Sequence, residues 1–290
     1  MKILEGNNKI EIAELDFFNP EHIFKCGQAF RWIEEEDGSY TNVAHNKIIN
    51  VSKGENIVID NSSLEDFQSI WMDYFDLNRD YGALREELSL DETLKNAMEY
   101  GSGIRILNQD PFETIITFII SANNQIPRIK NSVAKISEMY GSKIGSYGGR
   151  EYYSFPSSDE LSRAKVEDLR EFARVGFRDE RIVKTSKLIS EGAVDLNSLY
   201  EIPLEDARRE LMKLPGVGPK VADCVLLFAF KRSESFPVDV WIKRVMEELY
   251  LKKDTNKNLI ADEGRRIFGK NAGFAQQYLF YYGRENNLGR

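Results

Sequence analysis

Lys220 and Asp239 are the two residues whose types and surroundings point to covalent chemistry. Lys220 follows a proline at the predicted start of a helix, where the macrodipole and apolar neighbours disfavour a protonated amine. A neutral amine is a nucleophile, whereas a protonated one is not. Asp239 lies among apolar residues, where a carboxylate can stabilise developing positive charge. Each residue also has a structural interpretation, because such lysines often contact phosphate or solvent and Asp is a good helix N-cap.

A turn with two glycines comes directly before this lysine. The sequence Leu-Pro-Gly-Val-Gly-Pro-Lys at 214–220 follows an amphipathic stretch at 204–213 that predicts a helix, and its second proline predicts the first turn of another helix. Two glycines one residue apart let the backbone adopt positive φ and approach another molecule closely. Unpaired N–H groups at a helix start suit a phosphate. We therefore predict that Gly216, Val217 and Gly218 contact a DNA backbone, although a bare turn of this kind also joins packed helices without a ligand.

The elements that must position these residues predict an α+β fold in two parts. Segments 40–44 and 47–52 are alternating or β-branched, and the Asp-Gly and Lys-Gly-Glu-Asn sequences beside them are hairpin turn signals. We expect residues 1–100 to form an N-terminal antiparallel β-sheet domain with flanking helices. Residues 101–290 are expected to form a larger helical domain. It carries the two predicted helices and the glycine turn between them, which together make a helix-hairpin-helix.

Helix start and stop signals dominate from Ser63 onward. Asp110, followed by Pro and then Glu, predicts a helix N-terminus, and the following helix is apolar on nearly every side, which indicates burial. Another helix is expected from about Pro127 to Tyr140. The glycine-rich stretch 141–155 is expected to be a mobile connection. Glycines also predict the ends of several helices, at Gly101, Gly141, Gly176, Gly192 and Gly269.

Composition excludes several classes of protein. With 42% hydrophobic and 30% charged residues among 290, the chain has the composition of a soluble globular protein. Residues 1–8 contain no apolar signal region, and the longest apolar run, 225–230, is too short to span a bilayer. We therefore expect no membrane partner and a cytoplasmic location, nucleoid-associated in a prokaryote. Two cysteines and two histidines, far apart in the chain, predict no metal and no cofactor.

The distribution of charge allows a nucleic-acid partner even though the formal net charge is −8. Binding to a phosphate backbone usually draws on a basic surface. Residues 211–245 contain six basic and three acidic side chains, a local charge of +3, and residues 114–137 contain three basic side chains and no acid. An acidic protein can therefore present a basic face.

Five sequence motifs resemble those of one enzyme family and occur in the expected order. The hairpin LPGVGPKVADC and the following PVDVW, over 214–241, closely resemble the helix-hairpin-helix/Gly-Pro-Asp superfamily of base-excision glycosylases. Within it the chain is most similar to the 8-oxoguanine DNA glycosylase/AP lyase family. The other motifs are GQAFRW at 27–32, QDP to SANN at 109–124, GFR at 176–178 and AGFAQ to Phe at 272–280.

The resemblance implies a two-step reaction on double-stranded DNA that contains oxidised guanine. Lys220 would attack the anomeric carbon of the damaged nucleotide, expel the base and hold the sugar as a Schiff base, and β-elimination would then nick the strand. Asp239 would stabilise the oxocarbenium-like transition state. The nucleotide must first leave the stack, at a cost of roughly a few kcal/mol that is smaller for damaged pairs. We expect a monomer.

The resemblance also implies which residues bind the damaged base. The Gly27 carbonyl would accept the N7 hydrogen that 8-oxoguanine has and guanine lacks. Cys224 and Phe280 would sandwich the base, and Gln276 would bind its Watson–Crick edge. Cys224 follows Lys220 by one helical turn, which makes a shared pocket geometrically sensible. Without the resemblance, Cys224 and Phe280 are typical core residues.

A second group of residues is implied to contact the opposite strand. Asn123, Arg128 and Arg178 match positions that bind the cytosine left unpaired, and Phe177 matches the wedge that fills the gap. Without the resemblance these are ordinary surface or helix-end residues. The sequence departs from the usual pattern at Gln125, which replaces an Asn, and at Trp241, which stands where many relatives have His.

The sequence leaves two alternatives. A superfamily member for oxidised pyrimidines or mispaired adenine usually carries four cysteines for an iron–sulfur cluster near the C-terminus, where this chain has none, and an alkyl-base glycosylase normally lacks the hairpin lysine. A non-catalytic DNA-binding protein would use the hairpin as an anchor, and the Lys220–Asp239 pair would then be incidental.

Overall fold

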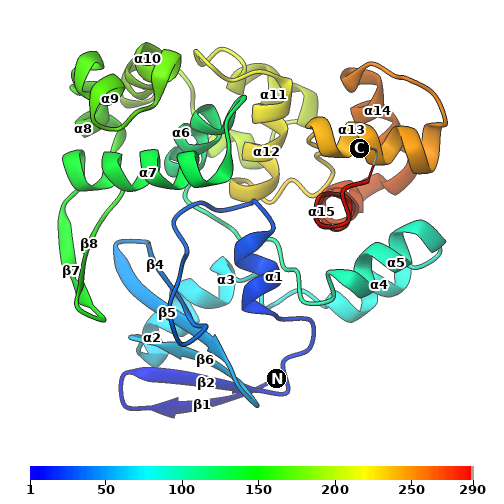
Figure 1. Cartoon of the computed structure of the whole chain (residues 1–290), viewed down its shortest axis with the longest axis horizontal. Coiled ribbons are helices and arrows are strands. Elements are labelled where there is room, and N and C mark those ends of the chain that lie inside the picture. Colours follow the sequence, from blue (N-terminus) through cyan, green and yellow to red (C-terminus); the bar gives the residue numbers. More distant parts are fainter. Residues whose placement is uncertain (289–290) are drawn as a thin grey trace.

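The computed structural model describes residues 1–288 as an N-terminal sheet below a larger group of helices (Figure 1). All neighbouring strands of the six-stranded sheet are antiparallel, in the order β1-β2-β6-β5-β4-β3. The predicted α+β class and antiparallel sheet are therefore confirmed. The strands are β1 (Lys2–Gly6), β2 (Lys9–Ala13), β3 (Ile33–Glu34), β4 (Tyr40–Ala44), β5 (Lys47–Lys53) and β6 (Ile57–Asp60).

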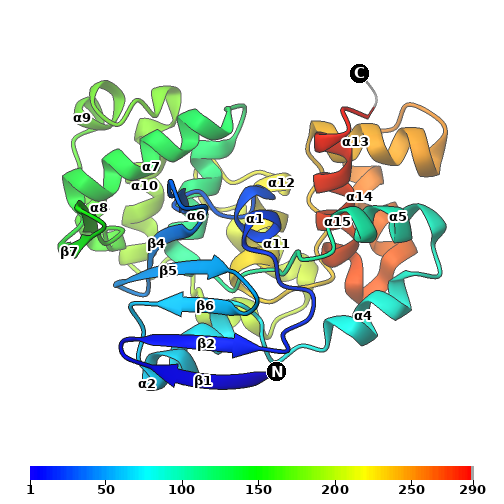
Figure 2. The same cartoon turned by 60° about the horizontal axis from the view of Figure 1, so that its bottom comes forward.

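Short helices pack against this sheet and enclose its core, and Figure 2 shows strands β1, β2, β6 and β5 side by side. The aromatic rings of Phe24 and Trp32 stack with centroids 3.6 Å apart, and Trp71 and Phe75 complete a largely aromatic cluster. The helices are α1 (Pro20–Lys25), α2 (Leu64–Asp66), a π-helical turn (Phe67–Trp71) and α3 (Met72–Tyr74).

The helical part extends from residue 81 almost to the end of the described chain. Asp110 caps the buried helix as predicted, because its Oδ1 accepts from the Glu113 amide at 2.8 Å. The α-helices are α4 (Tyr81–Leu88), α5 (Glu92–Tyr100), α6 (Pro111–Ser121), α7 (Ile126–Tyr140), α8 (Ser158–Ser162), α9 (Val166–Glu171), α10 (Asp179–Ser190), α11 (Leu204–Leu211), α12 (Pro219–Ala229), α13 (Val240–Val245), α14 (Lys257–Phe268) and α15 (Ala272–Glu285). Shorter turns are the 3-10 helices Gly176–Arg178, Asn197–Tyr200 and Gly269–Asn271 and a π-helix at Met246–Leu251.

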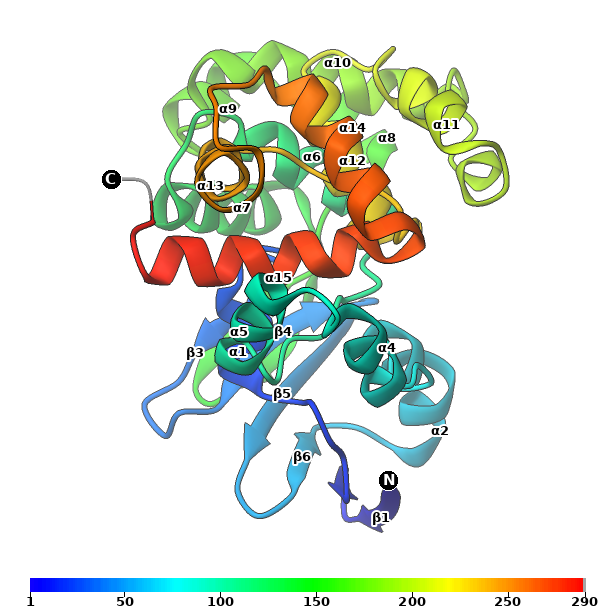
Figure 3. The same ribbon diagram turned by 90° about the vertical axis from the view of Figure 1, so that its right-hand side faces the viewer.

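Helix α15 joins the two parts of the molecule. Figure 3 shows it lying between α13 and α14 on one side and α5 on the other, and all three pack against it. Buried residues of α4 and α5 belong to the large helical core, as do Cys26 and Phe30, whereas the buried members of the sheet core lie within residues 10–77 and at Leu107. The apolar faces of α4 and α5 are thus covered by the C-terminal helices, and the boundary at residue 100 stays a prediction.

The predicted mobile connection at 141–155 is wrong. The segment forms a hairpin of β7 (Lys143–Tyr147) and β8 (Arg150–Tyr153), turned by two glycines with positive φ. Tyr152 is buried against the main sheet, and the Tyr147 hydroxyl donates to Asp60 Oδ2 at 2.6 Å. The glycines therefore make a tight turn, and the aromatic residues fix the hairpin to the sheet.

The predicted helix ends are confirmed with two corrections. Gly101, Gly141, Gly192 and Gly269 lie at or just after the ends of α5, α7, α10 and α14. Gly176 does not end a helix, because α9 stops at Glu171 and Gly176, with φ of +62°, begins a 3-10 turn. Helix α11 ends at Leu211, two residues earlier than predicted. Within residues 1–288, no helix has the length and apolar character needed to cross a membrane.

Candidate active site

A cavity of about 130 Å³ lies where the loop after α1 meets α6, α12 and α15. All six residues predicted for catalysis and base binding line it: Lys220, Asp239, Gly27, Cys224, Gln276 and Phe280. These residues come from four separate segments of the chain. The cavity therefore exists only because the sheet part and the helical part pack together.

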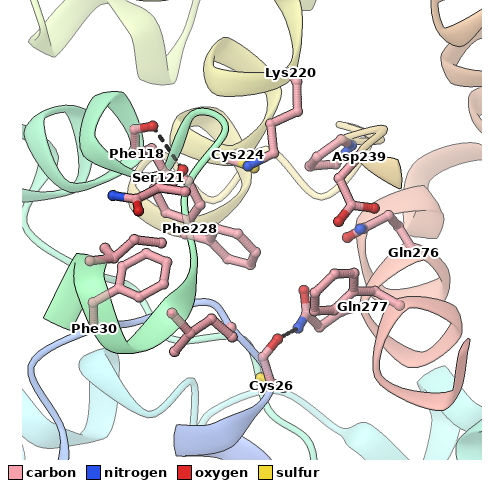
Figure 4. Close-up of a pocket in the computed structure, with 16 residues that line it drawn as sticks. Cys26, Phe30, Phe118, Ser121, Lys220, Cys224, Phe228, Asp239, Gln276 and Gln277 are labelled. Atoms are coloured by element: carbon pink, nitrogen blue, oxygen red, sulfur yellow. Dashed lines mark hydrogen bonds between the residues drawn. The ribbon is translucent and has the colours of Figure 1, made fainter. Parts of the chain in front are cut away.

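Lys220 and Asp239 enter the cavity from two different helices (Figure 4). Lys220 is in the first turn of α12, and its Nζ lies 5.0 Å from the centre of the Phe118 ring. Asp239 is the N-cap of α13, where Oδ1 accepts from the Ile242 amide at 2.8 Å. Among the described residues that line the cavity, Lys220 is the only cation and Asp239 the only carboxylate. One amine and one carboxylate therefore share a small, largely apolar space.

The Cys224 thiol is neutral beside this amine. Burial raises its pKa to about 11, although the neighbouring Lys220 charge acts in the opposite direction. Burial also raises the pKa of Cys26 to about 11, against the charge of Arg284. Because the thiolate is the nucleophilic form of cysteine, neither thiol competes with Lys220 near neutral pH.

The walls formed by Gly27, Phe280 and Gln276 suit a planar polar ligand. A Cβ atom on Gly27 would lie 3.2 Å from Cε1 of Phe280, so only glycine leaves the space between them open. Gln276 is 4% exposed, and its Oε1 accepts no hydrogen bond from residues 1–288. A buried amide oxygen without a donor partner is costly unless a ligand or water supplies the donor.

Sequence reasoning missed several residues of this cavity. Phe118 and Phe228 stack with their ring centroids 5.5 Å apart, and Phe30 meets Phe118 edge-on at 5.5 Å. Phe228 was detectable, because Lys220, Cys224 and Phe228 follow one another at four-residue spacing on α12. Gln277 has no comparable local signal. The remaining missed residues are Cys26, Ser121, Asn124, Ile126, Ile129 and Pro237.

The hairpin before α12 holds Lys220 in the first turn of a helix. Gly216 has φ of +93°, and a Cβ there would lie 3.1 Å from Ile119, so this glycine is required. Gly218 differs from the prediction, because its φ is −97° and a Cβ there would meet no atom within 4 Å. Gly218 is the N-cap of α12 and makes no side-chain cap. The helix start therefore stays open to an anion.

An ionic cluster ties α12 to two other helices. Asp223 is buried, with Oδ1 2.9 Å from Nε of Arg208 on α11 and 3.9 Å from Nη1 of Arg265 on α14. Burial raises the pKa of Asp223 to about 7, and the two arginines act in the opposite direction. The cluster therefore connects three helices next to the turn that carries Lys220 and Cys224.

The residues predicted for the opposite strand lie at two neighbouring turns. Arg178 is buried; its Nε donates to the Ala122 carbonyl at 3.1 Å and its Nη2 to the Asn123 carbonyl at 3.1 Å. Burial lowers the pKa of Arg178. Phe177 is 57% exposed, with Arg178 and Arg181 over its ring at 4.3 and 5.2 Å. Arg128 is exposed in the first turn of α7. Arg178 thus fastens the Phe177 turn to the Asn123 turn.

The side chains of residues 1–288 offer no group of three or more His, Cys, Asp or Glu placed to hold a metal ion. The side chains of the cavity that can take part in chemistry are Lys220 and Asp239.

Comparison with known proteins finds matches along nearly the whole chain. Residues 9–115 match the N-terminal domain of 8-oxoguanine DNA glycosylase, and residues 116–269 match the HhH-GPD superfamily of base excision DNA repair proteins. The N-glycosylase/DNA lyase of Saccharomyces cerevisiae is 32% identical over 278 residues, which span 87% of this chain and 73% of the yeast protein.

Solved structures of other proteins also match over nearly the whole chain. The Clostridium acetobutylicum 8-oxoguanine glycosylase/lyase, in complex with double-stranded DNA containing cytosine opposite 8-oxoG, has a TM-score of 0.96 and 44% identity, covering 99% of both chains. The 3-methyladenine DNA glycosylase of Archaeoglobus fulgidus has a TM-score of 0.73 and 23% identity, covers 95% of this chain and 98% of its own, and shares the fold. With both family models matched and the cavity residues in place, the chain belongs to the 8-oxoguanine DNA glycosylase/AP lyase family of the HhH-GPD superfamily.

Proposed function

We propose that this protein excises 8-oxoguanine opposite cytosine in duplex DNA and then cleaves the strand at the resulting abasic site. The observation that carries the proposal is the pairing of Lys220 with Asp239, the one cation and the one carboxylate among the described lining residues of a cavity built from family motifs. Family membership and the relatives' glycosylase/lyase activity support it. A non-catalytic DNA-binding protein would have no need for this pair.

The reaction begins with the Lys220 amine in its neutral form. Its nitrogen forms a bond to C1′ of the damaged nucleotide while the bond between C1′ and the base breaks. The base leaves with the bonding electrons and takes up a proton. Asp239 stabilises the positive charge that develops on the sugar, as a fixed carboxylate does in a cavity shielded from water. Asp239 also acts as the general base that accepts a proton from the attacking amine.

Strand cleavage follows from the same covalent bond. After the sugar ring opens, the Lys220 nitrogen and C1′ form a Schiff base, which makes the hydrogens on C2′ acidic. Removal of one C2′ proton expels the 3′ phosphate by β-elimination. Hydrolysis of the Schiff base then frees Lys220, so one lysine serves both steps.

The cavity walls recognise the base in this proposal. The Gly27 carbonyl accepts the N7 hydrogen of 8-oxoguanine, and Cys224 and Phe280 contact the two faces of the ring. The unpaired Gln276 Oε1 accepts hydrogen bonds from the Watson–Crick edge. A neutral Cys224 thiol fits this contact, because a thiolate would have to be desolvated against the base.

The surface outside the cavity binds the duplex. Phe177 fills the space that the flipped nucleotide leaves, and Asn123, Arg128 and Arg178 contact the unpaired cytosine. The hairpin at Gly216, Val217 and Gly218 contacts a phosphate, with N–H groups of the two glycines as donors, because the Val217 N–H already donates to the Leu214 carbonyl at 3.0 Å.

Borohydride trapping tests the proposal directly. The wild-type protein and Lys220→Gln are incubated with a duplex that holds one 8-oxoguanine opposite cytosine, with borohydride present to reduce a Schiff base to a stable amine. The expected result is a covalent protein–DNA adduct and released 8-oxoguanine with wild type, and neither with Lys220→Gln. Absence of adduct and of free base with folded wild-type protein would overturn the proposal and favour a DNA-binding role.

A further inference from the structure

Two glutamine side chains bind the backbone carbonyls of the residues before and after Gly27. Gln277 Nε2 donates to the Cys26 carbonyl at 2.7 Å, and Gln109 Nε2 donates to the Gln28 carbonyl at 2.8 Å. Gly27 itself has φ of +82°. Its own carbonyl accepts no hydrogen bond from residues 1–288. The carbonyl is therefore directed by its neighbours and remains available to a ligand in the cavity.

Gln277 makes a long-range contact with this loop. It is 2% exposed, follows Gln276 on α15 and lines the cavity, and its bond to the buried Cys26 joins residues 251 positions apart (Figure 4). The same helix carries Phe280, whose ring lies directly across from Gly27. One hydrogen bond thus ties the Cys26–Gly27 peptide to the helix that forms the opposite wall.

Gln28, which follows Gly27 in this loop, is held by hydrogen bonds of its own side chain. The Gln28 side chain donates to the Arg105 carbonyl at 2.8 Å and accepts from the Leu107 amide at 2.8 Å. The residue after Gly27 is therefore held through its side chain. On the other side of Gly27, the Cys26 thiol donates to the Ile23 carbonyl at 3.1 Å and lies 3.3 Å from the Gln28 side-chain nitrogen, and the Cys26 carbonyl accepts from Gln277.

We propose that Gln277 is a positioning residue that sets the selectivity for 8-oxoguanine over guanine by directing the Gly27 carbonyl. The proposal rests on the function proposed above. The carbonyl meets an N–H donor in 8-oxoguanine and the N7 lone pair in guanine, so discrimination depends on the direction of this oxygen. Loss of the Gln277 bond frees the Cys26–Gly27 peptide to rotate, and weakens lesion binding without removing any group that touches the DNA backbone.

The test compares two substitutions on α15. Gln277→Met keeps the length of the side chain and removes the donor. Tyr278→Phe is the matched control, because it also removes a buried hydrogen bond, from the Tyr278 hydroxyl to the Ile104 carbonyl at 3.4 Å, away from the loop. Both are made in Lys220→Gln protein, which retains no nucleophile in the cavity. Dissociation constants are measured for duplexes with 8-oxoguanine or guanine opposite cytosine, after thermal melting has shown that each protein is folded.

Gln277→Met is expected to lower the ratio of the two affinities by about tenfold, through weaker binding of the lesion duplex alone. Tyr278→Phe is expected to leave the ratio unchanged. In proteins that retain Lys220, cleavage of a preformed abasic site is expected to stay near wild type in both variants, because no base has to be recognised there. An unchanged ratio in folded Gln277→Met, or an equal loss for all three substrates, overturns the proposal.

Gln277→Glu provides a second variant. A protonated glutamic acid can donate to the Cys26 carbonyl, whereas the carboxylate cannot, so selectivity should fall as pH rises in this variant and not in wild type. A selectivity that does not depend on pH in Gln277→Glu, together with a normal ratio, also overturns the proposal. Failure of the Lys220→Gln parent to distinguish the two duplexes would instead overturn the proposed substrate, and the role of Gln277 with it.

Discussion

Asp239 accepts a hydrogen bond from the amide of Ile242 at 2.8 Å while it lines the same cavity as Lys220. The helix cap and the cavity carboxylate are therefore one side chain. The cap sets the position of the carboxylate, because Asp239 must stay at the first turn of α13 to satisfy an otherwise unpaired N–H group. The two interpretations of Asp239 from the sequence do not exclude each other.

Substitution separates the two roles of Asp239. Asn caps a helix about as well as Asp, so Asp239→Asn should change the free energy of unfolding by less than about 1 kcal/mol. The same change removes the negative charge and should lower the single-turnover rate of 8-oxoguanine excision by about 10²- to 10³-fold. Asp239→Ala should lose the cap as well, at a further cost of about 1 kcal/mol in urea denaturation. A wild-type excision rate in Asp239→Asn would show that capping is the whole role of this residue.

Local sequence signals located the predicted parts of the cavity. The Pro-Gly-Val-Gly turn predicts where α12 begins, and this places Lys220 and Cys224 one turn apart on one face. The meeting of Gly27 and Phe280 follows only from the family resemblance, because no local pattern relates residues from opposite ends of the chain. The structure places both residues on the walls of one cavity, where a Cβ on Gly27 would lie 3.2 Å from the Phe280 ring.

Contacts between distant elements could not be predicted. Gln277 is 251 residues from Cys26, and Arg178 is buried against carbonyls of a turn 56 residues earlier, although its sequence context is that of a surface residue. Helical or strand periodicity shows which face is buried and does not show which element covers it. The hairpin β7–β8 was missed for a related reason, since its glycines indicate a turn but its aromatic anchors act through the main sheet.

Phe177 is predicted to act through its exposed ring. Stacking of an aromatic ring on a base is worth about 1–3 kcal/mol, so Phe177→Ala should weaken binding to the lesion duplex by about 5- to 150-fold. Phe172→Ala is the control, because the two rings are 58% and 57% exposed and only Phe177 lies in the turn that Arg178 fastens to Asn123. Fluorescence anisotropy with the Lys220→Gln proteins gives both affinities. Equal losses in the two variants would contradict a specific wedge.

Both thiols should be unreactive in the folded protein near neutral pH. Burial raises the pKa of Cys26 and Cys224 to about 11, from 9.0. A thiol reagent at about pH 8 should therefore label native protein slowly and unfolded protein quickly. As pH rises above 9, the unfolded chain loses thiol protons before the folded chain does, so the stability that is present below 9 is lost as the pH passes through 11.

The pH dependence of the thiols is checked by urea denaturation at several pH values across this window. A Cys26→Ala, Cys224→Ala double variant should lose stability less steeply with rising pH than wild type does. The comparison between the two proteins removes the contribution of lysines and tyrosines that titrate in the same range. Identical slopes, or rapid labelling of native protein, would show that the thiols are not as buried as the structure has them.

The two hairpin glycines are predicted to respond differently to the same substitution. Gly216→Ala places a Cβ at φ of +93° and 3.1 Å from Ile119, so it should destabilise the protein by about 1 kcal/mol or more. Gly218→Ala meets no atom within 4 Å, so stability should be nearly unchanged. The added methyl at Gly218 stands at the open start of α12, where a phosphate must approach the backbone N–H groups. Gly218→Ala should therefore weaken DNA binding at least as much as Gly216→Ala does. Thermal melting and duplex affinity, measured on both variants, check the contrast. Full DNA affinity in Gly218→Ala would show that the phosphate does not approach the backbone at this residue.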